Sequence, residues 1–120
     1  MFLYISFPWK LVRDNVPLDI ERLGGYCIVK QLSGAAYRKA LAAKLVEEAM
    51  ECAKARTRAE CATELADLYS AAEAYRVACG LPEQEVDMAR RVKDAKMGQF
   101  SKGFKLMFVF KSFLTRRKAK

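Results

Sequence analysis

Acidic residues at helical spacing are the feature of this sequence most suggestive of chemistry. Glu48 and Glu51 stand three residues apart, and after twelve intervening residues Glu64 and Asp67 repeat the spacing. Residues three apart lie on the same side of a helix, so each pair would place two carboxylates on one face. Four carboxylates in a poorly solvated place repel one another unless a cation neutralises them. Oxygen-only ligands of this kind favour Mg²⁺, Mn²⁺ or Ca²⁺ over zinc.

The first acidic pair belongs to a long helix predicted over residues 33–56, with Ser33 as its N-cap. Its apolar side chains form one stripe, which comprises Tyr37, Leu41, Leu45, Cys52 and Ala55. Glu48 falls near the middle of that stripe. Because the apolar stripe of an amphipathic helix faces the core, Glu48 is predicted to point inward. An isolated buried carboxylate is normally protonated, paired or bound to a metal.

The second acidic pair belongs to a second long helix, which a Thr57/Glu60 capping box opens and Gly80 ends. Its predicted apolar stripe comprises Cys61, Leu65, Leu68, Ala72, Tyr75 and Cys79, with Glu64 at the edge and Asp67 beside it. If the two helices pack antiparallel through their stripes, the four carboxylates converge. The alternative interpretation is a solvated acidic face with Lys44 and Lys54 as intrahelical partners.

The rest of the chain predicts shorter elements. Pro17 can begin a short helix that Gly24 and Gly25 end, and residues 26–32 suit a brief strand or an extended connection. Pro82 begins a third helix that Gly98 ends. The pattern from Gln99 onward does not decide between a strand, a helix and a segment that lies on a membrane surface. The predicted fold is all-α: a helical bundle of two long central helices plus shorter helices, completed by oligomerisation, with short extended segments near the ends.

Composition narrows the classes of mechanism. The 120 residues suit one domain, and the absence of histidine excludes every His-dependent mechanism. Four cysteines without a CxxC pair do not suit a zinc site, so we interpret them as small core residues. The net charge of +8 is concentrated in residues 101–120, which hold seven basic residues and no acidic one. No apolar stretch is long enough to span a membrane, and residues 1–9 lack the features of a secretory signal, which favours a cytoplasmic protein.

The acidic pattern, read in order, resembles that of a known superfamily. Residues 47–51 (EEAME) followed by residues 64–67 (ELAD) resemble the EExxE…ExxD signature of the all-α nucleoside triphosphate pyrophosphohydrolases, the MazG-like superfamily. Residues 10–17, KLVRDNVP, resemble the opening of one small-protein branch, and LSGAAYRKALAAKLVEEAMEC and GQFSKGF are also similar to that branch. The similarity covers residues 10–106, so we predict a pyrophosphohydrolase domain over residues 1–106 and a hydrophobic-then-basic tail over residues 107–120.

The resemblance implies a hydrolase that converts a nucleoside triphosphate to the monophosphate and pyrophosphate with Mg²⁺, for which Mn²⁺ can substitute. Non-standard nucleotides are one candidate substrate class. The implied metal ligands are Glu48, Glu51, Glu64 and Asp67. Glu47 and Glu48 are the implied catalytic carboxylates, Glu47 acting from the outer shell or as an auxiliary acid. A homodimer or higher homo-oligomer is expected. The alternatives are a phosphoribosyl-ATP pyrophosphohydrolase and a non-catalytic helical module that binds a partner or a membrane.

A triphosphate also needs cations beyond the metal. The candidates that we expect to bind substrate are Lys10, Arg13, Lys44, Lys93 and Lys96. Phe100 is the aromatic candidate for contact with a base, the alternative being an ordinary core residue. Met97 stands where related sequences tend to carry arginine, which puts substrate affinity in question. The basic tail suggests contact with nucleic acid or with an anionic membrane, against the alternative of a merely solvated tail.

Overall fold

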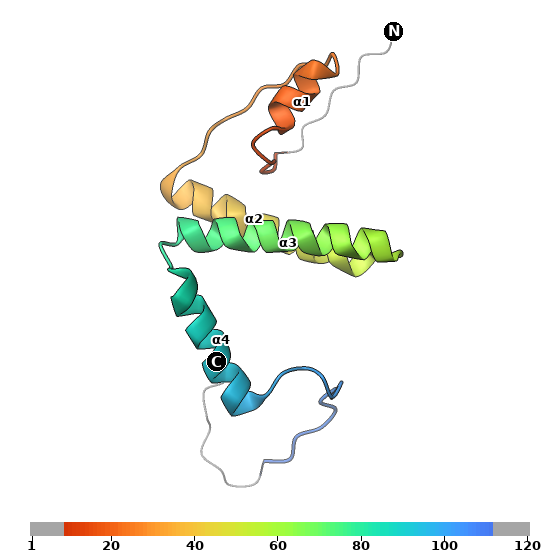
Figure 1. Cartoon of the computed structure of the whole chain (residues 1–120), viewed down its shortest axis with the longest axis vertical. Helices are drawn as coiled ribbons and strands as arrows, with labels where there is room; N and C mark the ends of the chain where they lie inside the picture. Colours follow the sequence, from red (N-terminus) through yellow and green to blue (C-terminus); the bar gives the residue numbers. More distant parts are fainter. Residues whose placement is uncertain (1–8, 112–120) are drawn as a thin grey trace. The chain divides into compact units, whose positions relative to one another are not determined.

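The computed structural model describes residues 9–111, and this part of the chain contains four α-helices and no strand (Figure 1). The helices are α1 (Val16–Arg22), α2 (Gly34–Lys54), α3 (Arg58–Ala78) and α4 (Glu83–Met97). The all-α prediction is confirmed. Within residues 9–111, no helix is both long enough and apolar enough to cross a bilayer. The apolar residues 1–8 and residues 112–120 of the basic tail lie outside the described residues.

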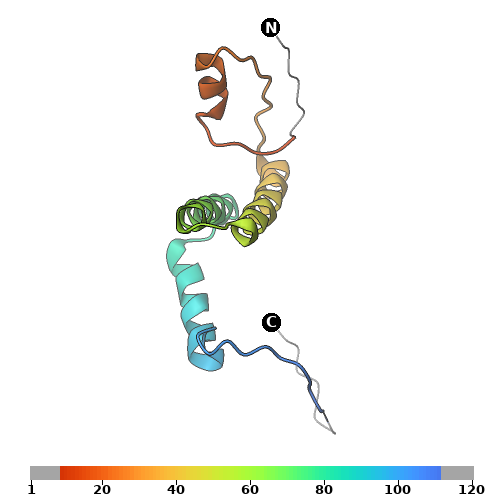
Figure 2. The ribbon, with the colours of Figure 1, turned by 90° about the vertical axis from the view of Figure 1, so that its right-hand side faces the viewer.

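The two long helices, α2 and α3, lie side by side and run in opposite directions (Figures 1 and 2). Only residues 55–57 connect them, and the predicted capping box holds that turn. The Thr57 hydroxyl accepts a hydrogen bond of 3.1 Å from the Glu60 backbone N–H, while the Glu60 carboxylate accepts one of 2.8 Å from the Arg56 N–H. Ser33 is the N-cap residue of α2, as predicted, but its side chain makes no capping hydrogen bond.

The buried apolar residues of the described chain are Leu41 on α2 and Ala71 on α3. Ala71 is the buried residue of α3, so it marks the packed face of this helix. The predicted apolar stripe of α3 is therefore wrong in part, because Cys61, Leu65 and Ala72 are exposed. Cys61 is accordingly no core residue, whereas the other cysteines are partly buried.

Two compact units divide the chain, the first ending at Val86 and the second beginning at Asp87, within α4. In the first unit, residues 26–32 form the extended connection that the sequence allowed, without strand pairing. In the second unit, α4 ends at Met97, directly before Gly98, whose φ of 78° suits glycine. Residues 103–111 form neither of the predicted regular structures and are exposed throughout.

Candidate metal centre

Glu48 is the buried carboxylate of the described chain, with 7% of its surface exposed. The prediction that it points inward from α2 is confirmed. The ammonium group of Lys44, one turn earlier on the same helix, lies 3.2 Å from Glu48 Oε1 and 3.3 Å from Glu47 Oε1. This lysine supplies the compensation that a buried carboxylate needs.

Helix α3 brings Glu64 and Asp67 to the same place. One carboxylate oxygen from each of Glu48, Glu64 and Asp67 lies within 4.8 Å of the other two. We call these three residues the carboxylate triad. Oxygens bound to one Mg²⁺ at about 2.1 Å are separated by roughly 3–4 Å, so a small shift of the side chains at most would bring the triad to this spacing. The donor set is all oxygen, which suits a hard divalent cation such as Mg²⁺, Mn²⁺ or Ca²⁺.

The triad concentrates negative charge on Glu64. Desolvation by burial raises the pKa of this carboxyl group, and the charges of Asp67, Glu48, Glu51 and Glu60 raise it further. Among residues 9–111, Glu64 takes part in no ion pair, whereas Glu48 pairs with Lys44 and Asp67 pairs with Arg13. The ionised form of Glu64 therefore lacks a cationic partner among these residues, and an added cation would stabilise it.

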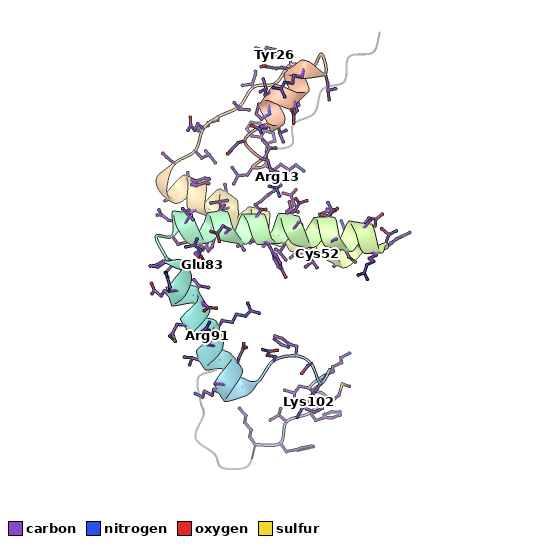
Figure 3. The ribbon with its side chains drawn as sticks, in the orientation of Figure 1. Arg13, Tyr26, Cys52, Glu83, Arg91 and Lys102 are labelled. Carbon is purple, nitrogen blue, oxygen red and sulfur yellow. The ribbon has the colours of Figure 1, made fainter. Side chains whose placement is uncertain are left out.

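Two cations of the segment before α1 reach the acidic residues of the long helices. The Arg13 side chain lies next to the long helices (Figure 3). Its Nη2 donates a hydrogen bond of 2.7 Å to Asp67 Oδ1, and Lys10 Nζ donates one of 3.1 Å to Glu47 Oε1. Burial by itself would raise the pKa of Glu47, but the hydrogen bonds from Lys10 and Lys44 outweigh it and the pKa is lowered. Three of the predicted phosphate-binding cations, Lys10, Arg13 and Lys44, thus lie beside the predicted acidic residues.

Other predicted residues lie elsewhere. Glu51 is exposed, its carboxylate 4.0 Å from Lys54, and it does not belong to the group of converging oxygens, although its charge acts on Glu64. Lys93, Lys96 and Met97 are exposed on α4 in the second unit. Phe100 belongs to the same unit and is 98% exposed, so within this chain it is no core residue. Contact of Lys93, Lys96 and Phe100 with substrate stays a prediction.

Cys52 is a neighbour of the triad that sequence reasoning treated only as a core residue. Burial raises the pKa of its thiol, and the charges of Glu64, Glu48 and Asp67 raise it further. Without a bound ion the thiol therefore stays protonated at neutral pH. Its spacing was the available signal, because a residue four positions after Glu48 lies on the same face of the helix.

The arrangement combines a cluster of oxygen ligands with three adjoining cations, which suits a divalent ion and a phosphate group side by side.

Comparison with protein-family models, curated proteins and solved structures finds no match to this chain.

Proposed function

We propose that the protein is a Mg²⁺-dependent nucleotide pyrophosphohydrolase of the MazG-like type, which cleaves a nucleoside triphosphate into the monophosphate and pyrophosphate. The observation that supports this best is the convergence of three carboxylates, one of them buried, from two neighbouring helices. The resemblance of residues 47–51 and 64–67 to the EExxE…ExxD signature points to the same reaction.

In the proposed site, Glu48, Glu64 and Asp67 would hold the ion, and Glu51 would join them by a change of side-chain rotamer. A bound divalent ion would supply neutralisation of the charge that develops on the phosphate oxygens and would make an attacking water more acidic. Water attacks the α-phosphorus, the bond from that phosphorus to the bridging oxygen breaks, and pyrophosphate leaves. Glu47 or Glu48 accepts the proton that the water loses. Lys44, held by both of these residues, lies where it can orient a phosphate.

The test follows pyrophosphate release from a panel of nucleoside triphosphates, non-standard nucleotides and phosphoribosyl-ATP in the presence of Mg²⁺. We expect Glu48→Gln and Asp67→Asn to lower the rate by more than about 100-fold, since losing even an outer-shell partner of a metal site costs roughly 10–100-fold. Glu85→Gln is the matched control, because this exposed carboxylate stands on α4. Two outcomes would contradict the proposal. Either both site variants release pyrophosphate at the wild-type rate, or the wild-type protein releases none from any compound of the panel.

We also propose that the long helices pack against a second copy of the chain. Val46, Met50, Leu65 and Tyr69 leave large apolar side chains exposed on α2 and α3. Exposed apolar surface of this kind marks association sites. Sedimentation velocity should give a dimer or larger species, and Met50→Lys should shift it toward the monomer. A monomeric wild-type protein at all concentrations would refute this part.

A further inference from the structure

The charges around the carboxylate triad leave a small imbalance. Glu47, Glu48, Glu64 and Asp67 supply four negative charges, and Lys10, Arg13 and Lys44 supply three positive ones. Glu51 and Lys54 add one charge of each sign, so this sum is the same whether Glu51 contacts Lys54 or the ion. The group thus carries one negative charge in excess, which repels a polyphosphate. A divalent ion reverses the sign to one positive charge in excess, which attracts a polyphosphate.

The three cations differ in how firmly they are held. Lys44 stands on α2 with a side chain only 20% exposed, in contact with both Glu47 and Glu48. Arg13 stands on a segment without regular secondary structure, and its side chain is 61% exposed. Exposed ion pairs of this kind contribute little to stability, so Arg13 can leave Asp67 at small cost.

The carboxylate of Asp67 takes part in two competing interactions. It supplies an oxygen to the carboxylate triad, and it also accepts the hydrogen bond from Arg13. A divalent ion at the triad repels the guanidinium group and withdraws negative charge from Asp67, which weakens this ion pair. The displaced guanidinium has the planar, two-pronged geometry that suits phosphate oxygens.

We propose that Arg13 exchanges partners during binding: it neutralises Asp67 when no ion is bound, and it turns to the polyphosphate once a divalent ion takes its place. This inference rests on the proposed function, because it assumes a divalent ion at the triad. It makes Arg13 a competitor of the ion and a binding residue for the polyphosphate. A merely structural role, in which Arg13 holds the segment before α1, has no such double effect.

The experiment measures binding to the full chain by calorimetry, first with Mn²⁺ alone and then with inorganic triphosphate in excess Mn²⁺. We expect Arg13→Gln to bind Mn²⁺ more tightly, on the order of two- to fivefold, because a competing charge has gone. The same variant should bind triphosphate about tenfold or more weakly, since a charge-assisted contact is lost. Arg13→Lys should bind Mn²⁺ like the wild type, because it keeps the charge. Its affinity for triphosphate should lie between those of the wild type and Arg13→Gln.

Arg91→Gln is the matched control, an exposed arginine paired with Asp87 on α4, and it should change neither affinity. Unchanged or weaker Mn²⁺ binding by Arg13→Gln overturns the exchange and leaves the proposed function standing. Absence of Mn²⁺ binding by the wild-type protein overturns both. Tighter Mn²⁺ binding together with weaker triphosphate binding supports the exchange.

Discussion

The charged residues of the α2–α3 pair and those of residues 98–111 behave in opposite ways. On the long helices, acidic residues gather beside cations from distant parts of the chain, and Glu48 is buried. In residues 98–111, Lys102, Lys105 and Lys111 stand among exposed aromatic side chains without an acidic neighbour in sequence. Lys102 lies over the ring of Phe104, 5.8 Å from its centroid. Helix packing therefore concentrates charge of both signs in one region, whereas the other leaves its cations exposed and without a nearby acidic residue in the sequence.

The largest expected effect concerns stability, and it contrasts a buried residue with an exposed one. Leu41→Ala removes the largest buried apolar side chain of α2 and should lower the free energy of unfolding by about 2–5 kcal/mol. Phe108→Ala should change it by less than about 0.5 kcal/mol, because Phe108 is exposed. Urea unfolding followed by circular dichroism measures both. Equal losses would mean that residues 98–111 pack against something in solution.

A second prediction concerns the pH dependence of stability, which tests how the acidic residues of the long helices contribute to it. The pKa of Glu64 is raised above its ordinary value of 4.5, so the folded protein holds this proton at pH values where the unfolded chain has released it. Stability from this group is therefore greatest below 4.5 and falls as pH rises through the raised pKa. The Glu47 pKa is lowered, so its contribution is present above 4.5 and is lost as pH falls below it.

Glu64→Gln isolates the first of these contributions. In the presence of a chelator, the urea midpoint of the wild type should fall relative to that of Glu64→Gln as pH rises above 4.5, while Glu85→Gln should follow the wild type. Added Mg²⁺ should then raise the wild-type midpoint and leave that of Glu64→Gln nearly unchanged. Parallel pH profiles for the wild type and Glu64→Gln would contradict the electrostatic account.

The smallest expected effect on turnover comes from removing the tail, residues 107–120. Deletion after Leu106 should leave the rate of pyrophosphate release within about twofold, because these residues lie outside the predicted pyrophosphohydrolase domain. The same deletion should weaken binding to anionic liposomes or to RNA, and wild-type binding should fall as salt rises. Flotation and filter-binding assays measure this. No binding by either protein would dismiss the idea of a polyanion-binding tail.

Local pattern predicted the elements well, because the signals that end helices are local. The capping box at Thr57, the stop at Gly80 and the burial of Glu48 all follow from residues within one or two turns. The packed face of α3 was predicted less well. An apolar stripe shows which residues avoid water, whereas the burial of Ala71 depends on how α3 lies against α2, and no local pattern gives this.

The contacts of Arg13 and Lys10 lay beyond sequence reasoning in their detail. Their cationic character made them candidates for phosphate, but 54 positions separate Arg13 from Asp67, and no local rule pairs them. Glu51 shows the converse difficulty. The spacing of Glu51 matches that of the other acidic residues. A helical wheel shows on which side of the helix a side chain lies, but not whether that side is covered, and in the structure Glu51 is exposed beside Lys54.

The short connection at residues 55–57 has a consequence for folding. Glu48, Glu64 and Asp67 lie within one stretch of twenty residues, so bringing them together closes only a small loop. Because contacts between near neighbours in the chain form quickly, we expect the helical hairpin to assemble before Arg13 reaches Asp67, 54 positions away. A peptide of the two long helices is thus the natural minimal unit in which to look for the earliest ion-dependent structure.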